Sequence, residues 1–183
     1  MIPIDFYFLL FTFKCPILTS ASHWIKHLQL AQHVEGGWYS EVYRSALMIR
    51  KEQLPPVFSG ARNACTHIYF LLEQGNFSAF HRIASDELWH FYSGDPLVVY
   101  EIDTRGSLTE HLLGNNPLLG HSPFCVISAG SWFGSRPATG SEYALVGCTV
   151  SPGFDFADFE LANADELAAA HPSHEILIRS LIR

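Results

Sequence analysis

Apolar and polar residues alternate along much of the chain between residues 38 and 150, which is the pattern of strands with one buried face. Turn sequences rich in Gly, Asn and Pro separate these segments, as at Gly75-Asn76 and Gly94-Asp95-Pro96. The pattern predicts strands over residues 38–45, 67–73, 77–83, 87–93, 97–102, 107–113, 123–127, 131–135 and 141–150. Short strands at this spacing favour a closed sandwich or a jelly roll.

Helical patterns flank this mainly β region at both ends. Ser22 can cap a helix that runs to about Gln32. Near the other end, Asn163 and Glu166 have the spacing of a capping box, and Ser173 can cap a last helix with one apolar side. We therefore expect short helices that cover the outside of an all-β domain.

Composition limits the partners and the compartment. A chain of 183 residues with 48% hydrophobic and 16% charged residues predicts one globular domain. The net charge of −7 and the lack of a Lys/Arg run argue against nucleic acid or a membrane surface as a partner. The four cysteines have no zinc-site spacing, which favours buried free thiols and a cytoplasmic protein.

The first 21 residues form an apolar extension that we separate from the domain of residues 22–183. Three interpretations stay open for it: a poorly defined or non-native extension, a signal or anchor that leaves secretion open, and an extra strand of the domain. The apolar run over residues 6–13 is too short to span a bilayer, which needs about 20 residues.

Candidate chemistry is concentrated on two neighbouring predicted strands. Alternation places His81 on one face of its strand, and Glu87, Trp89 and Phe91 on one face of the next. A buried carboxylate needs a partner, and a histidine beside a carboxylate is a good general base. We therefore predict that His81 and Glu87 meet inside the barrel, with Glu87 orienting the imidazole.

The motif His81-x-Ile83-x-x-x-Glu87, followed after six residues by Gly94, resembles the first cupin motif, and the segment 128–133 resembles the second. More narrowly, the segments 33–39, 68–72, 80–96 and 145–161 are similar to the cupin-5 family, a domain of unknown function (DUF985). The resemblance covers about residues 26–182. It implies a cupin double-stranded β-helix, or jelly roll.

Two positions depart from the metal-binding cupin pattern. Ile83 and Phe133 stand where metal-binding cupins have histidine. An iron or manganese site of this type uses two or three histidines with one carboxylate, and only His81 and Glu87 remain. We therefore predict no metal and no other cofactor.

The resemblance extends to the metal-free cupin that epimerises deoxysugar nucleotides. It implies His81 as the base and Tyr69 as an acid, if the strand turns Tyr69 inward. An alternative is a non-enzymatic module that binds a sugar or nucleotide in the same pocket, and a metal-dependent enzyme is a third. Fold likeness alone does not choose between them.

Further residues are expected to bind the ligand or to frame it. Trp89, Phe91 and Trp132 would form apolar walls, and Ser85 is a further candidate contact. Glu41 and Arg44 lie on opposite faces of one strand by parity, and Arg44 would hold either an anionic ligand or a surface carboxylate. Exposed strand edges near the N-terminus predict a homodimer.

Overall fold

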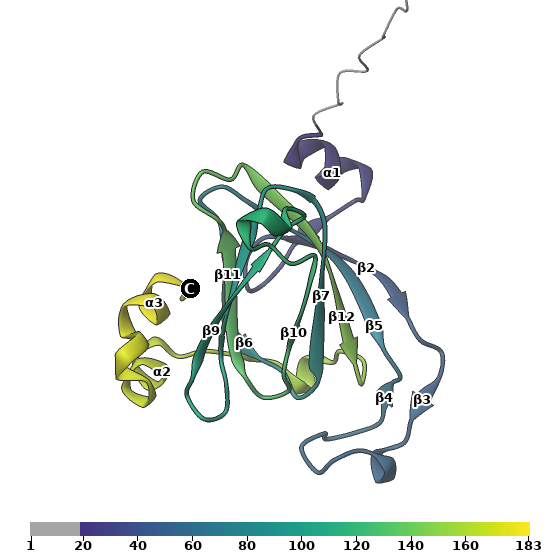
Figure 1. Cartoon of the computed structure of the whole chain (residues 1–183). Helices are drawn as coiled ribbons and strands as arrows, with labels where there is room; N and C mark the ends of the chain where they lie inside the picture. Colours follow the sequence, from purple (N-terminus) through teal and green to yellow (C-terminus); the bar gives the residue numbers. More distant parts are fainter. Residues whose placement is uncertain (1–18) are drawn as a thin grey trace, which may run out of the picture.

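The computed structural model describes residues 19–183, so the expectations for residues 1–18 lie outside the described part. Two antiparallel sheets pack face to face and enclose the interior (Figure 1). The larger sheet contains, in spatial order, β1 (Ala31–Gln32), β2 (Trp38–Arg44), β5 (Thr66–Glu73), β12 (Tyr143–Ser151), β7 (Asp86–Gly94) and β10 (Phe124–Ile127). The smaller contains β13 (Glu160–Leu161), β6 (Ser78–Arg82), β11 (Trp132–Pro137), β8 (Leu97–Ile102) and β9 (Leu108–Leu113). The predicted jelly roll is confirmed.

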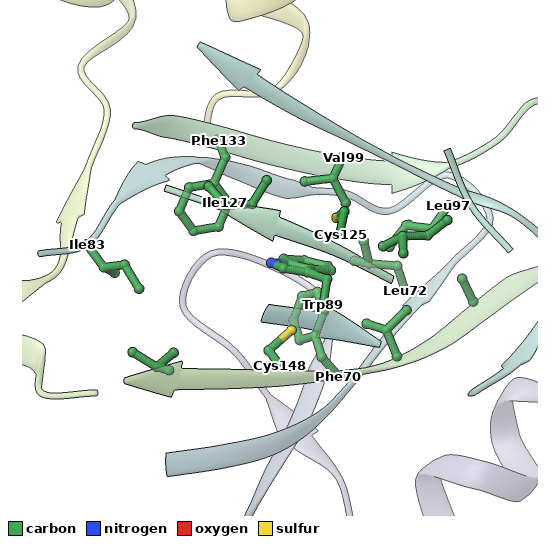
Figure 2. Close-up of a cluster of buried hydrophobic side chains, with 14 residues drawn as sticks. Phe70, Leu72, Ile83, Trp89, Leu97, Val99, Cys125, Ile127, Phe133 and Cys148 are labelled. Atoms are coloured by element: carbon green, nitrogen blue, oxygen red, sulfur yellow. The ribbon is translucent and has the colours of Figure 1, made fainter. Parts of the chain in front are cut away.

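Inward-facing side chains from both sheets fill one part of this interior. Trp89, Phe70 and Phe133 are each 1% exposed, and the rings of Phe70 and Phe133 meet Trp89 in T-shaped contacts, with centroids 6.0 Å and 6.4 Å from it (Figure 2). Leu97 and Val99 of β8 are fully buried in the same cluster. Strand alternation therefore places the core where the hydrophobic pattern predicts it.

Short helices cover the outer faces of the sheets. α2 (Ala164–Ala170) and α3 (Glu175–Ser180) bury Leu167, Ile178 and Leu181 against the outer face of the smaller sheet (Figure 1). α1 (Ala21–His27) packs on one end of the larger sheet. Four 3-10 turns complete the elements of residues 19–183: η1 (Lys51–Gln53), η2 (Pro117–Leu119), η3 (Phe156–Asp158) and η4 (Pro172–His174). In the described part of the chain, no helix is long and apolar enough to cross a membrane.

Two predicted helix starts are wrong, while the capping by Asn163 is confirmed. The first helix is capped by Ser20 and stops at His27, because Gln29 takes a left-handed conformation (φ 54°) and the chain turns into β1. Ser173 lies inside η4 and caps nothing, since the last helix begins only after His174. Asn163 accepts the N–H groups of the first turn of α2.

The segment between β2 and β5 forms an arm that the alternation did not predict. β3 (Met48–Ile49) and β4 (Arg62–Asn63) pair with each other and with neither large sheet. The arm extends from one end of the barrel (Figure 1). It lies beside the loop of residues 152–159, to which Arg62 connects it.

Candidate functional site

A cavity of about 420 Å³ occupies the end of the interior that the core leaves open. We call it the barrel cavity. His81 and Ile83 reach it from the smaller sheet, whereas Glu87 and Cys148 reach it from the larger sheet. The predicted pair His81 and Glu87 therefore lines one cavity from opposite walls.

Both ring nitrogens of His81 are engaged. The imidazole is 3% exposed, and its Nδ1 lies 2.8 Å from the carbonyl oxygen of Ala79. Its Nε2 lies 3.1 Å from Oε2 of Glu35. Rings of Phe133 and Phe159 pack against it, with centroids 4.1 Å and 5.3 Å away. The orienting carboxylate is therefore Glu35, and the prediction that Glu87 holds this position is wrong.

The contact between His81 and Glu35 requires a shared proton. A carbonyl oxygen only accepts, so Nδ1 must donate to Ala79, and a neutral imidazole then presents a lone pair at Nε2. Oε2 of Glu35 can face that lone pair only if one of the two groups carries a further proton. Burial lowers the pKa of His81 and raises the pKa of Glu35. We therefore describe a His81–Glu35 pair that holds one mobile proton.

Glu87 is the buried titratable group that stays without an ion-pair partner. Its side chain is 7% exposed, and no ion pair to it occurs within residues 19–183. Burial, with a smaller contribution from the charge of Glu35, raises the pKa of Glu87 from 4.5 to about 7, and the charge of His81 and a hydrogen bond from the thiol of Cys148 offset only part of this. A carboxyl group that titrates near neutral pH inside a cavity can both accept and donate protons.

A tight turn between β1 and β2 brings Glu35 into the cavity together with His33. The turn needs Gly36 at φ +111°, where a Cβ atom would collide with the carbonyl oxygen of Phe77. Arg183 fastens the turn from outside by donating to the carbonyl oxygen of Glu35 at 3.1 Å. Glu35 also accepts a 2.9 Å hydrogen bond from Oγ of Ser78. These contacts fix a carboxylate that lies in no regular strand.

Glu41 and Arg44 form an ion pair at the mouth of the cavity. Arg44 donates from Nε and Nη2 to the two carboxylate oxygens of Glu41, at 2.8 Å and 2.6 Å. The prediction of opposite faces is wrong, because a bulge between Glu41 and Tyr43 shifts the register and turns both side chains inward.

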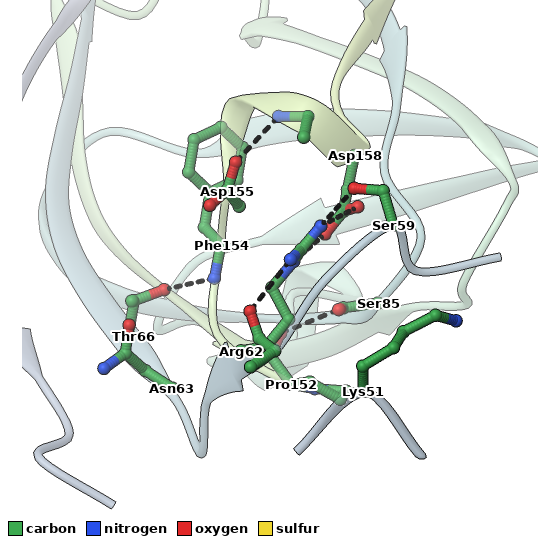
Figure 3. A network of polar contacts seen from close by, with 12 residues as sticks. Lys51, Ser59, Arg62, Asn63, Thr66, Ser85, Pro152, Phe154, Asp155 and Asp158 are labelled. Carbon is green, nitrogen blue, oxygen red and sulfur yellow. Dashed lines mark hydrogen bonds and ion pairs between the residues drawn. The ribbon is translucent and has the colours of Figure 1, made fainter. Parts of the chain in front are cut away.

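A loop after β12 closes one side of the cavity with Phe154, Phe156 and Phe159. The loop is fixed by Arg62, whose Nε and Nη2 donate to Asp158 at 2.6 Å each (Figure 3). Both side chains of this pair are only 5% exposed. The arm between β2 and β5 thus supports the wall of the cavity.

Several predicted ligand contacts lie elsewhere. Tyr69 faces outward and packs near α1, because its neighbours Ile68 and Phe70 take the inward positions of β5. Trp132 lies on the outer face of β11, where Arg82 stacks on it at 4.5 Å. The prediction that these two rings face the pocket is wrong.

The remaining residues that were predicted to contact the ligand belong to the packed core or hold a loop, and they do not line the cavity. Trp89 and Phe91 face inward as predicted, but they belong to the packed core and not to the cavity lining. Ser85 is 4% exposed and donates to the carbonyl oxygen of Pro152 at 2.7 Å. It holds the loop of residues 152–159 rather than facing the cavity.

Sequence reasoning assigned no role to His33, Glu35, Tyr39 or the phenylalanines of the loop. The paired glycines after Glu35, which permit a tight turn or a close backbone approach, are the sequence signal that could have found this turn. Strand alternation could not place Glu35, since alternation applies only within a strand.

Comparison with known proteins settles the family. The Cupin_5 family model, described as cupin superfamily (DUF985), matches residues 22–162. The chain belongs to this family. The resemblance read from the sequence is confirmed, and a search of curated proteins finds no match.

Solved structures show how far the likeness extends. A hypothetical protein from Leishmania major is 37% identical with a TM-score of 0.81, over 90% of this chain and 99% of that one. A protein from Shewanella oneidensis is 40% identical with a TM-score of 0.80, over 91% and 99% of the two chains. Oxalate decarboxylase from Bacillus subtilis is 13% identical with a TM-score of 0.50, over 82% of this chain and 36% of that one, which shows the fold alone.

The donor set of this Cupin_5 domain does not fit the metal site of other cupins. Ile83 and Phe133 stand where the resemblance to metal-binding cupins places histidines, and the ring of Phe133 packs on His81. Both nitrogens of His81 already have partners. Within residues 19–183, no group of three or more His, Cys, Asp or Glu side chains could hold a metal ion.

Proposed function

We propose that this protein is a metal-independent acid–base enzyme, an isomerase or epimerase that acts on a small carbonyl compound in the barrel cavity. The observation that carries the proposal is the placement of two proton-bearing groups on opposite walls. Glu87 projects from β7 of the larger sheet, and the His81–Glu35 pair lies against β6 of the smaller sheet. Their environments differ, which is how acid and base roles are separated in many active sites.

The proton balance of such a reaction is simple. The carboxylate of Glu87 takes a proton from the carbon next to the carbonyl group, and an enolate forms. The His81–Glu35 pair returns its mobile proton to the opposite face of that carbon, which inverts the configuration. Glu87 then loses its proton to water as the product leaves, and the pair takes one up. The resemblance assigned the base to His81, but the engaged nitrogens favour Glu87 in this role.

The charges of the groups that line the cavity limit the class of substrate that it can bind. Among residues 19–183, the cavity is lined by four carboxyl groups, those of Glu35, Glu41, Glu87 and Asp155, and by one guanidinium, that of Arg44, which Glu41 already neutralises. A nucleotide diphosphate would meet an excess of carboxylates. A carbohydrate-like compound without phosphate fits the lining better.

The test is deuterium exchange in deuterium oxide at the carbon next to the carbonyl of a panel of ketoses and keto-sugars, followed by mass spectrometry. The protein should catalyse exchange, and the rate should rise as the pH passes about 7, because Glu87 must be ionised to accept a proton. Glu87→Gln should lower the rate by about 10²–10⁴-fold. The control Glu110→Gln changes an exposed carboxylate on β9 and should leave the rate unchanged.

A non-enzymatic binding module is the second candidate. It is favoured by the large apolar share of the lining, which includes Ile68, Ile83, Val150 and the phenylalanines of the loop. Ligands that bind the cavity but never exchange deuterium would support this candidate. Exchange that is equally fast in Glu87→Gln would contradict the assignment of the base.

A further inference from the structure

At the mouth of the barrel cavity, the positively charged guanidinium of Arg44 is already engaged by groups of the same chain. Arg44 donates to both oxygens of Glu41, and its Nη1 donates to Oδ1 of Asn63 at 3.0 Å and to the carbonyl oxygen of Phe154 at 3.2 Å. Asp155 lies close enough to raise the pKa of Arg44 further. Four of the five N–H groups of this guanidinium are engaged within the chain, and Glu41 offsets its charge, so the mouth offers little attraction to an incoming anion.

Aromatic rings, which can attract a cation, line the same cavity. The centroid of Phe154 lies 5.1 Å from that of Phe156 and 6.1 Å from that of Phe159, and the rings meet at steep angles. Tyr39 and the ring of His33, 4.5 Å apart, continue the wall. Phe156 is 59% exposed, so its ring is accessible to a ligand that enters the cavity. Ring faces attract cations through their quadrupole.

Glu87 provides a third and independent observation. Its carboxyl group is more than nine-tenths buried, lines the cavity and has no ion-pair partner among residues 19–183. Such a group is costly in its charged form unless a cation reaches it. A ligand with a positive charge would supply that partner.

We propose that the barrel cavity binds a small organic cation, with an ammonium group held between the aromatic wall and Glu87. The inference deepens the proposed function and rests on it in one respect: the substrate becomes a carbonyl compound that carries an amine, such as an amino sugar. An ammonium group at Glu87 also stabilises the carboxylate form that accepts a proton. Glu87 then both binds the positive charge of the substrate and accepts its proton.

The experiment compares choline with its neutral carbon isostere, in which a carbon atom replaces the nitrogen. The two probes share shape and apolar area, so a difference in binding reports the charge. Isothermal calorimetry on the full chain should show choline binding at least about tenfold more tightly than the isostere. Phe156→Leu and Glu87→Gln should each remove most of this difference and leave the binding of the isostere nearly unchanged.

A matched control tests whether the loss of the preference for choline is specific to the aromatic wall of the cavity. Phe124→Leu changes a phenylalanine that is 42% exposed on β10, outside the barrel cavity, and should leave the preference for choline intact. Equal binding of the two probes, or no binding of choline, would overturn the inference. Choline has no carbonyl group, so this result is independent of the exchange experiment, and exchange in a neutral ketose would keep the acid–base proposal while the cation proposal fails.

Discussion

At the scale of single residues, the raised pKa of Glu87 links folding to pH. Between about pH 4.5 and about pH 7, the folded state keeps a proton on Glu87 that the unfolded state has lost. The free energy of unfolding should therefore fall as the pH rises through this range, by up to about 3 kcal/mol, and Glu87 should add no further pH dependence above it. In Glu87→Gln this loss is absent, so the variant should gain stability relative to the wild type as the pH rises.

Urea unfolding at about pH 5 and about pH 8 checks this prediction. The difference in stability between Glu87→Gln and the wild type should be larger at the higher pH. The exposed control Glu110→Gln should show nearly the same difference at both pH values. A pH-independent difference for Glu87→Gln would mean that Glu87 titrates as it does in the unfolded chain.

The carboxylate of Glu35 supports a second prediction at this scale. Glu35→Ala would remove the acceptor of the fully buried Ser78 hydroxyl and the partner of the nearly buried imidazole of His81. Unpaired buried polar groups cost about 1–3 kcal/mol, so the variant should unfold at lower urea concentration. Glu35→Gln keeps an acceptor for Ser78 and should lose less. Equal losses in the two variants would show that packing, and not hydrogen bonding, explains the effect.

The sequence predicted His81 and Glu87 in the cavity because both lie in regular strands, where alternation decides the direction of each side chain. It could not predict their partners. Glu35 comes from a turn far away in the chain, and the bulge after Glu41 reverses the parity that placed Arg44 on the other face. Side chains at turns and bulges are set by tertiary contacts that no local pattern records.

At the scale of elements, the buried pair Arg62–Asp158 joins the arm of β3 and β4 to the cavity wall. Removing one partner leaves an uncompensated buried charge, which costs about 3–5 kcal/mol. Asp158→Asn should therefore lower the stability strongly and expose residues 152–159 to limited proteolysis. The double variant Arg62→Leu/Asp158→Leu should recover part of the stability, because it leaves no unpaired charge.

The control for this prediction is Arg179→Leu. Arg179 pairs with Asp165 and Glu175 on the surface of α2 and α3, where its side chain is 47% exposed. Its removal should change the urea midpoint little. Similar losses for Arg179→Leu and Asp158→Asn would show that burial does not distinguish the two ion pairs.

Strands were the elements that the sequence predicted best. The boundaries of the long strands agree within about two residues, since alternation and turn residues mark both ends. The arm over residues 45–65 was missed because it carries no long alternating run and consists of two-residue strands and a 3-10 turn. Its order depends on Arg62, and one ion pair leaves no periodic signal.

At the scale of the whole molecule, the interior is divided into a packed part and an open part. Trp89 and its neighbours fill the space between the sheets at one end, whereas the turn at Glu35, the bulge after Glu41 and the loop of residues 152–159 surround the other. The regular strands supply the core together with His81 and Glu87, and the irregular segments supply Glu35 and much of the remaining cavity lining. This division explains why the fold could be predicted from the sequence more completely than the site.

One sheet face has no cover in the described part of the chain. Beyond α1, the outer face of the larger sheet presents Tyr43, Tyr92, Phe124 and Val126, which are 40% to 53% exposed. His67 lies between them, and burial and the nearby His90 lower its pKa, so it is neutral at pH 7. Because the chain has a net charge of −7, a patch made of these uncharged side chains is where two copies can approach with little repulsion.

We therefore expect the homodimer predicted from the sequence to form through this face. Sedimentation equilibrium at micromolar concentration should give a dimer for the wild type, and Tyr92→Glu and Phe124→Glu should give monomers, because each would bury an unpaired carboxylate at the interface. Ile176→Glu is the control: Ile176 is 90% exposed on α3, which covers the other sheet, and the variant should stay dimeric. A monomeric wild type would contradict the dimer, and a dimer that survives both substitutions would place the interface on another face.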